Sequence, residues 1–176
     1  MNTVYKHIHS CLNKHNIRPL WIRKINKQLI RLLKKNYIEI EGHKLFLDKH
    51  DSMRLSTRGY FEPELIGLFR SNIKEGDKVI DVGAHIGFHT LTFAKLVGDH
   101  GKVYAFEPCP ENAELLKKNV AINGYKNIEI IQKAVSDKTG MVGFFVDNFH
   151  SGTHRIVDSD SNCSIEVESI RLDELN

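Results

Sequence analysis

From residue 78 onward the chain alternates short apolar runs with helical periodicity, and this alternation constrains the fold more than any other feature. Apolar runs bounded by turn residues occupy 78–82, 102–107 and 128–136, and helical patterns occupy 87–97 and 110–123. Pro110 suits the first turn of a helix, and Gly124 suits the position just after its end. This order predicts an α/β, Rossmann-like, doubly wound parallel sheet. Right-handed crossovers place its strands in the spatial order third, second, first.

Segments on both sides of this alternation extend the domain. Residues 37–48 are typical of a β-hairpin around a glycine turn, 49–60 of irregular chain, and 63–73 of a helix opened by Pro63. Residues 141–147 and 163–172 predict two further strands, which we expect to form an antiparallel addition. We therefore divide the chain into an extension (1–36) and one domain (37–176).

The extension is basic and amphipathic. Between Ile17 and Lys35 there are seven basic residues and no acidic one, beside an apolar stripe at three- and four-residue steps. We expect a helix that packs its stripe on the domain and solvates its charges. Peripheral contact with a membrane remains open for such a helix. Contact with RNA is less expected, because no RNA-reading motif accompanies the charges.

Composition sets the general class of the protein. A chain of 176 residues with 41% hydrophobic and 27% charged residues suits one ordinary globular domain. The three cysteines, Cys11, Cys109 and Cys163, are sparse and follow no metal-binding spacing, which favours reduced thiols and a cytoplasmic location. The first ten residues lack the apolar core of a secretory signal, and no stretch approaches the ~18 apolar residues of a membrane span.

The main chemical signal is the pattern Asp81-x-Gly83-x-x-x-Gly87, directly after the strand at 78–82. Glycine lets a ligand approach the backbone closely, and the N-terminus of the following helix offers unpaired N–H groups to a carboxylate. Ligands of open α/β sheets bind at this carboxyl end of the strands. Asp81 stands where it could meet a cationic amine. The bland alternative for such a glycine pair is a tight turn.

A second carboxylate, Glu107, ends the next strand and strengthens the case for a nucleoside ligand. At that place a carboxylate typically accepts hydrogen bonds from ribose hydroxyls. The dinucleotide fingerprint G-x-G-x-x-G has a glycine two residues after the first, whereas this chain has His85 there. The pattern therefore disfavours a nicotinamide oxidoreductase and suits a ligand with an amino-acid end and no phosphates.

At this point the chain resembles the FkbM-type family of S-adenosylmethionine-dependent, class I methyltransferases. The resemblance covers roughly residues 37–175 and rests on several sequence blocks taken together. These are GYFEPELIGLF, GDKVIDVGAHIGFHTLTFAKL, GKVYAFEPCPENAELLKKNVAING, IIQKAVSDKTG, SGTHRIVDS and IRLDEL. It implies O-methylation of a sugar, a glycolipid or another hydroxyl-bearing metabolite.

The resemblance also implies roles for individual residues. Asp81, Gly83 and Gly87 would hold the methionine moiety of S-adenosyl-L-methionine, and Glu62 would lie near that end. Glu107 would hold the ribose, and Ala134 and Val135 would flank the adenine. The full set of expected cofactor-binding residues is Glu62, Asp81, Gly83, Ala84, His85, Gly87, Glu107, Pro108, Ala134 and Val135.

One departure from the family pattern concerns the end of the sequence. After LDEL the family continues with a strand reading roughly K-I-D-V-E-G, whereas this sequence ends at Asn176. We therefore expect an incomplete domain whose strand 78–82 has an unpaired edge, which invites self-association. An alternative function follows, namely a truncated cofactor-binding module or remnant without turnover.

The residues that would carry catalysis are less defined. A histidine can remove a proton from a hydroxyl acceptor, and His154 in a polar loop is the candidate base. The pairs His85/His89 and His150/His154 have i, i+4 spacing, but a metal pair of that kind needs a continuous helix and a third ligand. Since Gly87 opens the helix and leaves His85 in the turn, we expect no metal site.

Overall fold

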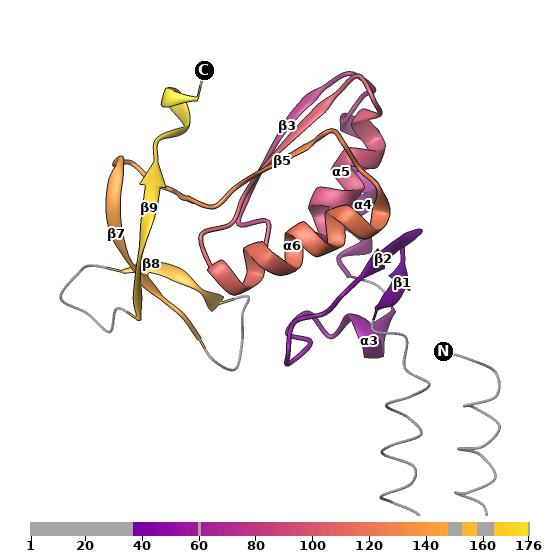
Figure 1. Cartoon of the computed structure of the whole chain (residues 1–176). Coiled ribbons are helices and arrows are strands. Elements are labelled where there is room, and N and C mark those ends of the chain that lie inside the picture. The colour runs from indigo at the N-terminus through magenta and orange to yellow at the C-terminus, as the bar shows by residue number, and fades with distance from the viewer. Residues whose placement is uncertain (1–36, 60, 148–152, 158–163, 176) are drawn as a thin grey trace, which may run out of the picture. The chain divides into compact units, whose positions relative to one another are not determined.

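The computed structural model describes residues 37–59, 61–147, 153–157 and 164–175. The basic extension, 1–36, lies outside the described residues, so its predicted helix stays a prediction. Figure 1 shows the described elements and the order in which the chain connects them.

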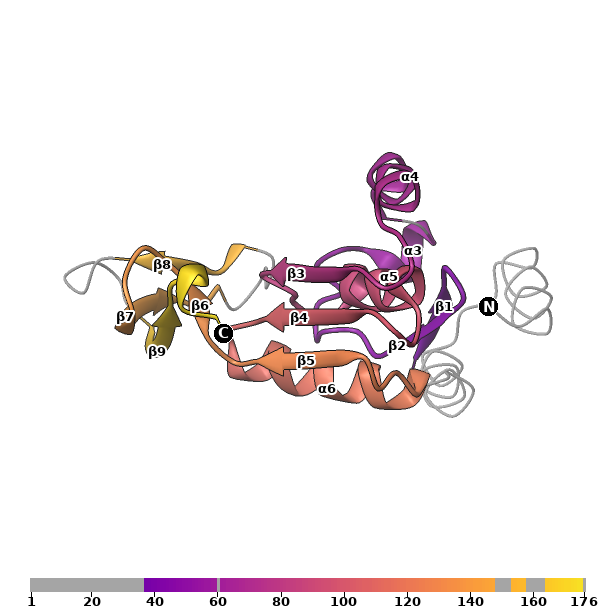
Figure 2. The same cartoon turned by 90° about the horizontal axis from the view of Figure 1, so that it is seen from above.

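The core of the domain is the parallel sheet that the alternation predicts. Strands β3 (Lys78–Val82), β4 (Lys102–Phe106) and β5 (Ile128–Ile131) are parallel and lie in the order β3-β4-β5. Figure 2 shows them side by side. The predicted fold class and spatial strand order are therefore confirmed.

Two helices connect these strands. They are α5 (Phe88–Val97) and α6 (Pro110–Asn123), and α6 ends at Gly124 in the left-handed conformation as expected. Both crossovers step in the same direction across the sheet, so right-handed connections place both helices on one face. Val103 and Ala105 of β4 point to that face and are fully buried. Ile80 and Val82 point to the other face and are 46% and 54% exposed.

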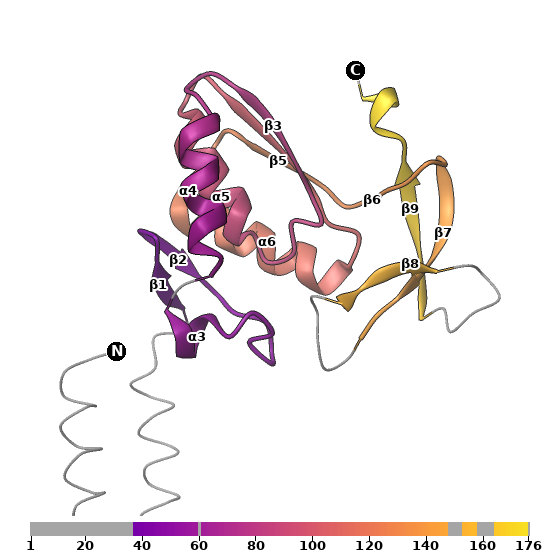
Figure 3. The same ribbon diagram turned by 180° about the vertical axis from the view of Figure 1, so that it is seen from behind.

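The predicted third strand divides in two. It was expected over 128–136, but β5 ends at Ile131 and a separate strand β6 (Ala134–Val135) follows a turn in which the Lys133 N–H donates to the Ile131 carbonyl at 2.9 Å. The chain leaves the parallel sheet at this turn and enters a second one (Figure 3).

The second sheet has the strand order β6-β9-β7-β8. Strands β7 (Gly140–Phe145) and β9 (Ile165–Ile170) are antiparallel, as predicted. Strand β8 (Arg155–Val157) was not predicted, and a short 3₁₀ helix, η2 (Leu172–Glu174), follows β9. Phe144 and Val167 of this sheet pack with Ala134 and with Cys109 from the loop after β4.

The elements before the parallel sheet pack beside its helices. The predicted hairpin is present as β1 (Ile38–Ile40) and β2 (His43–Leu45), and the helix opened by Pro63 is α4 (Pro63–Asn72). A short helix, α3 (Leu55–Arg58), lies where irregular chain was expected. Buried side chains of β1, β2, α3, α4 and α5 form one apolar cluster.

Candidate functional site

The turn between β3 and α5 is fastened to the end of β4. The N–H groups of Gly83 and Ala84 both donate to the Phe106 carbonyl at 2.9 Å. Gly83, His85 and Gly87 have positive φ angles of 78°, 53° and 94°. Glycine adopts this conformation without the steric cost that a Cβ atom brings, whereas His85 adopts it as a non-glycine residue. Hydrogen bonds and left-handed backbone angles therefore define the conformation of this turn.

The two glycines of the turn are required for different reasons. A Cβ atom added to Gly83 would meet no atom within 4 Å, so the space beside it is open. A Cβ atom added to Gly87 would lie 2.5 Å from Cδ1 of Leu116 on α6. Gly87 thus allows helix α6 to pack closely against the turn. The sequence pattern indicates only that this glycine lets a ligand approach the backbone.

Glu107 is the main polar group at the end of β4. Its side chain is 4% exposed, and it accepts hydrogen bonds from the backbone N–H groups of His85 (2.7 Å) and Cys109 (2.9 Å). The Asn112 amide donates to it at 3.4 Å. Burial raises the pKa of the Glu107 carboxyl, and these hydrogen bonds oppose the rise. The carboxylate joins the β3 turn to the start of α6.

A cavity of about 250 Å³ opens beside this carboxylate. Six of the predicted cofactor-binding residues line it: Gly83, His85, Glu107, Pro108, Ala134 and Val135. Ala134 and Val135 belong to the second sheet, which also lines the cavity through Phe144, Arg155 and Ile156, and His154 lines it just before β8. Asn112 and Lys133 also line the cavity and were not predicted. Its volume is slightly below the range of about 300–1,000 Å³ usual for ligand pockets.

The other predicted residues lie outside the cavity lining. Ala84 is buried and Gly87 faces Leu116. Asp81 points toward α5, where the Thr90 hydroxyl donates to it at 2.6 Å. Burial raises the pKa of Asp81, and the bond from Thr90 opposes the rise. Asp81 therefore connects β3 to α5.

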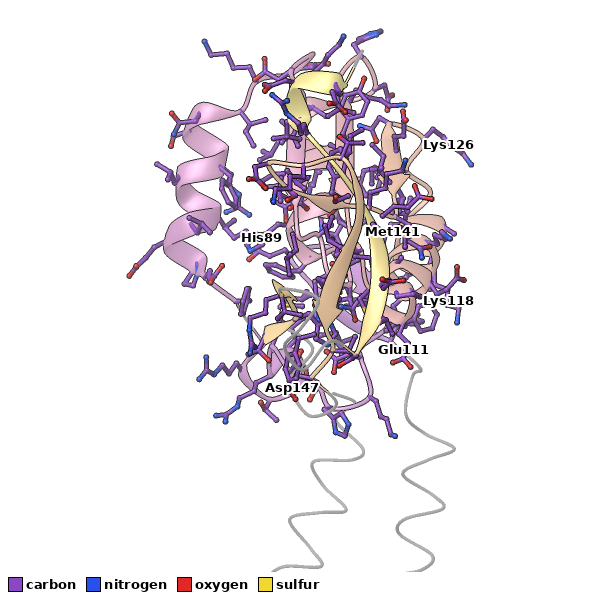
Figure 4. All side chains as sticks on the ribbon, turned by 90° about the vertical axis from the view of Figure 1, so that its left-hand side faces the viewer. His89, Glu111, Lys118, Lys126, Met141 and Asp147 are labelled. Carbon is purple, nitrogen blue, oxygen red and sulfur yellow. The ribbon has the colours of Figure 1, made fainter. Side chains whose placement is uncertain are left out.

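Glu62 belongs to a group of side chains between α4 and α5. Its carboxylate lies 3.1 Å from Nε2 of His89, and its own φ angle is 45°. His89 lies between α4 and the rest of the domain (Figure 4). The imidazole is surrounded by the aromatic rings of Phe61, Phe69, Phe88 and Phe93. It is also close enough to Asp81 to favour ionisation of that carboxyl. Glu62 and Asp81 thus share one histidine neighbour.

Two histidines line the cavity, namely His85 from the turn after β3 and His154 from the position just before β8. Desolvation lowers the pKa of His85 to about 4, although the nearby Asp48 carboxylate opposes the shift, so His85 is neutral near pH 7. His154 packs edge-on against Phe144, and its Nε2 lies 3.2 Å from the Asp147 carbonyl. Its Nδ1 is buried and has no hydrogen-bond partner among the described residues. If Nε2 carries the proton and donates it to this carbonyl, Nδ1 is left as an acceptor.

The described part of the chain has neither a cluster of metal ligands nor a membrane-spanning helix. Within residues 37–59, 61–147, 153–157 and 164–175, no three histidine, cysteine or acidic side chains gather as they would around a metal ion. None of the described helices has the length and apolar character needed to cross a bilayer.

Known proteins similar to this chain are methyltransferases. The protein-L-isoaspartate O-methyltransferase 1 of Archaeoglobus fulgidus is 37% identical over 60 residues, which cover 34% of this chain and 28% of that protein. The probable cobalt-precorrin-6B C(15)-methyltransferase of Sulfolobus acidocaldarius is 32% identical over 96 residues, or 54% of this chain and 50% of the relative. The chain therefore spans half or less of the length of these relatives.

Solved structures also align with parts of this chain. A SAM-dependent methyltransferase of Aquifex aeolicus is 30% identical, with 55% of this chain and 48% of that chain covered and a TM-score of 0.40. A SAM-dependent O-methyltransferase of Thermotoga maritima is 24% identical, with 58% and 43% covered and a TM-score of 0.41.

A family comparison covers the turn, Glu107 and the second sheet together. The methyltransferase FkbM domain matches residues 81–175, which is more than half of the 176-residue chain. The match begins at Asp81 and ends just after η2, so it includes every residue that lines the cavity. The chain belongs to the FkbM family of S-adenosylmethionine-dependent methyltransferases.

Proposed function

We propose that the chain binds S-adenosyl-L-methionine with the adenosine part in the cavity beside Glu107. The observation that carries this proposal is the position of the Glu107 carboxylate. It is buried, it lines the cavity, and Gly83, which has open space beside it, lines the same cavity. An ionised carboxylate has about four acceptor positions. Three protein donors occupy Glu107, which leaves capacity for a ligand hydroxyl.

This position is supported by three more residues of the predicted set, whereas Glu62, Asp81, Ala84 and Gly87 lie outside the cavity lining. Ala134 and Val135 give the cavity an apolar wall, as an adenine ring requires, and Gly83 admits a ligand close to the backbone. Glu62 and Asp81, which share His89 as a neighbour, remain the carboxylates that we assign to the cationic methionine end.

We further propose that the protein transfers a methyl group to a hydroxyl of a sugar, a glycolipid or a similar metabolite. When bound, the cofactor supplies an electrophilic methyl group, so the protein has to align the acceptor and take up its proton. His154 is the candidate base, because its Nδ1 has no hydrogen-bond partner among the described residues and the residue lines the cavity. The named acceptors of the relatives, an isoaspartyl protein and a precorrin, differ from this proposal.

A cofactor-binding module without turnover is the second candidate function. It is favoured by the exposure of Val82, which lines the cavity and is nevertheless 54% exposed. A cavity open on that side would leave a bound cofactor in contact with water, and preorganised catalytic contacts act best where water is excluded.

Isothermal titration calorimetry with S-adenosylhomocysteine tests the binding proposal. Replacing Glu107 with Gln keeps its shape and removes its charge, and we expect the affinity to fall by about 1.5–3 kcal/mol, the range for a hydrogen bond to a charged group. The control is Glu129→Gln, which removes an exposed carboxylate paired with Lys102 on the neighbouring strand. Equal affinities of wild type and Glu107→Gln would exclude the ribose assignment.

Two further measurements distinguish the candidate functions. Titration with NADH separates a methyltransferase from a nicotinamide enzyme, and we expect no binding. Transfer of a radiolabelled methyl group to a panel of sugars, glycolipids and other hydroxyl compounds separates an enzyme from a binding module. Binding of S-adenosylhomocysteine by the wild-type chain without methyl transfer to any acceptor would favour the module.

A further inference from the structure

Asn119 is a fully buried polar residue on α6 whose side chain joins two distant parts of the chain. Its Oδ1 accepts the Phe46 N–H at 2.7 Å, and its Nδ2 donates to the Phe46 carbonyl at 3.1 Å. The same Nδ2 donates to the Ile86 carbonyl at 2.7 Å. Phe46 follows the hairpin strand β2, and Ile86 lies in the turn between Gly83 and Gly87.

The bond to Ile86 holds a part of the turn that does not line the cavity. The cavity side of the turn is fixed by Phe106 and Glu107, which bond the N–H groups of residues 83, 84 and 85. Ile86 is fully buried, and its carbonyl is held by Asn119. A buried carbonyl without a partner is unfavourable, so the amide sets where this part of the backbone can lie.

Only an amide side chain suits this arrangement. One planar group has to accept from an N–H and donate twice, to two carbonyls that come from different segments. Leucine would fill the space but satisfy none of the three groups. Aspartate would keep the bond from the Phe46 N–H, but in its ionised form it cannot donate to either carbonyl.

We propose that Asn119 is a positioning residue for the cofactor-binding turn and acts through the bond from its Nδ2 to the Ile86 carbonyl. This inference rests on the proposed function, since it assumes that the turn binds the cofactor. The same amide also binds the backbone of Phe46, which lies outside the family match at 81–175. Asp48, at the end of the same segment, acts electrostatically on His85 through its carboxylate.

The same helix contains a natural comparison residue. Asn123, one turn later, accepts the Lys44 N–H at 2.9 Å and donates to the Lys44 carbonyl at 2.7 Å. It thus makes the same pair of bonds to the hairpin as Asn119 makes to Phe46. Among the described residues, its side-chain hydrogen bonds reach Lys44 and Asn119, but not the turn. Variants of the two residues therefore distinguish the effect of losing bonds to the hairpin from the effect of losing the bond to the turn.

The test measures S-adenosylhomocysteine affinity in the whole chain with Asn119→Ala, Asn123→Ala and Val97→Ala. Val97 is fully buried at the far end of α5, so its variant controls for a general loss of stability. At a temperature where all three are folded, we expect the Kd to rise about tenfold for Asn119→Ala and to stay within about twofold for the others. Unchanged affinity in Asn119→Ala, or an equal loss in all three, would overturn the proposal.

Amide hydrogen exchange of the segment 83–88 provides a readout that does not depend on a ligand. We expect faster exchange there in Asn119→Ala than in Asn123→Ala, and equal rates in the two variants would also overturn the inference. Asn119→Ser serves if the alanine variant does not fold, because its hydroxyl retains a polar group in the core. If the wild type itself fails to bind S-adenosylhomocysteine, the proposed function fails, and the exchange rates still decide whether Asn119 holds the turn.

Discussion

At the scale of single residues, Gly83 can be compared with Gly124, which has the same backbone conformation but lies away from the cavity. Gly83 and Gly124 have φ angles of 78° and 77°, and a Cβ atom at either would meet no atom within 4 Å. An alanine in the left-handed region costs about 1–2 kcal/mol. Gly83→Ala and Gly124→Ala should therefore lower the free energy of unfolding by similar amounts, measured by urea denaturation.

The two variants should differ in cofactor binding. Gly83 lines the cavity, whereas Gly124 ends α6 and does not. We expect calorimetry to show weakened S-adenosylhomocysteine binding for Gly83→Ala alone, and loss of binding for Gly83→Val with the far-ultraviolet circular dichroism nearly unchanged. Normal binding by Gly83→Ala would mean that this glycine serves the turn and not the ligand.

His85 makes stability depend on pH. Its pKa falls from 6.5 to about 4 on folding because the imidazole is desolvated. Between these values the unfolded chain binds more protons than the folded one, so stability decreases as pH falls from about 6.5 to about 4. The full shift corresponds to at most about 3 kcal/mol. Asparagine tolerates the left-handed conformation of His85. In His85→Asn, the midpoint of thermal denaturation should therefore depend less on pH over this range.

Other titratable groups with shifted pKa values also change how stability depends on pH in this acidic range. The pKa of buried His43 is also lowered, so some decline should persist in His85→Asn. The pKa values of Asp81 and Glu107 are raised, so these carboxyls oppose the decline by binding protons in the folded state first. Parallel curves for wild type and His85→Asn would show that His85 titrates normally.

At the scale of elements, Asp81 and Thr90 connect strand β3 to helix α5. Thr90→Val keeps the shape of the side chain and removes the hydroxyl that donates to Asp81. The loss should cost about 1.5–3 kcal/mol near pH 7, where the carboxylate is ionised, and less in acid, where it is protonated. Thr92→Val is the matched control, because Thr92 is also buried but donates to a carbonyl of its own helix. Equal costs for both variants at pH 7 would contradict this role of Asp81.

The elements that could be predicted from sequence are those with a long periodic pattern or a clear cap. The three parallel strands, α5, α6 and the hairpin follow from such patterns. The helix 55–58 and the strand 155–157 are too short to show a period, and the latter is fixed by pairing with β7. The division of the third strand likewise depends on β6 pairing with β9.

Residues of the candidate site could be predicted where they follow a strand end or belong to a sequence block shared with the family. Gly83 and Glu107 follow strand ends, and both line the cavity. Thr90, Asn112 and Asn119 act through contacts that the fold creates, and no spacing in the sequence indicates them. The packing of Gly87 against Leu116 is of the same kind, since it joins residues from two different elements.

At the scale of the whole domain, helices cover one face of the parallel sheet, and strand β3 exposes two apolar side chains on the other face. Ile80 and Val82 are 46% and 54% exposed, and among the described residues β3 pairs only with β4. An open, apolar edge strand is a template for pairing with another strand. Antiparallel pairing of β3 with β3 of a second copy would place Ile80 beside Ile80 and satisfy both edges.

We therefore predict that the 176-residue chain, produced alone, self-associates through β3. Sedimentation velocity should show a sedimentation coefficient that rises with protein concentration, and Ile80→Lys should abolish the rise because it places a charge at the paired edge. Met141→Lys is the matched control, since Met141 is 59% exposed but lies on β7 in the second sheet. Equal association of both variants would place the contact elsewhere, and a wild type that is monomeric at every concentration would show that β3 is tolerated as an open edge.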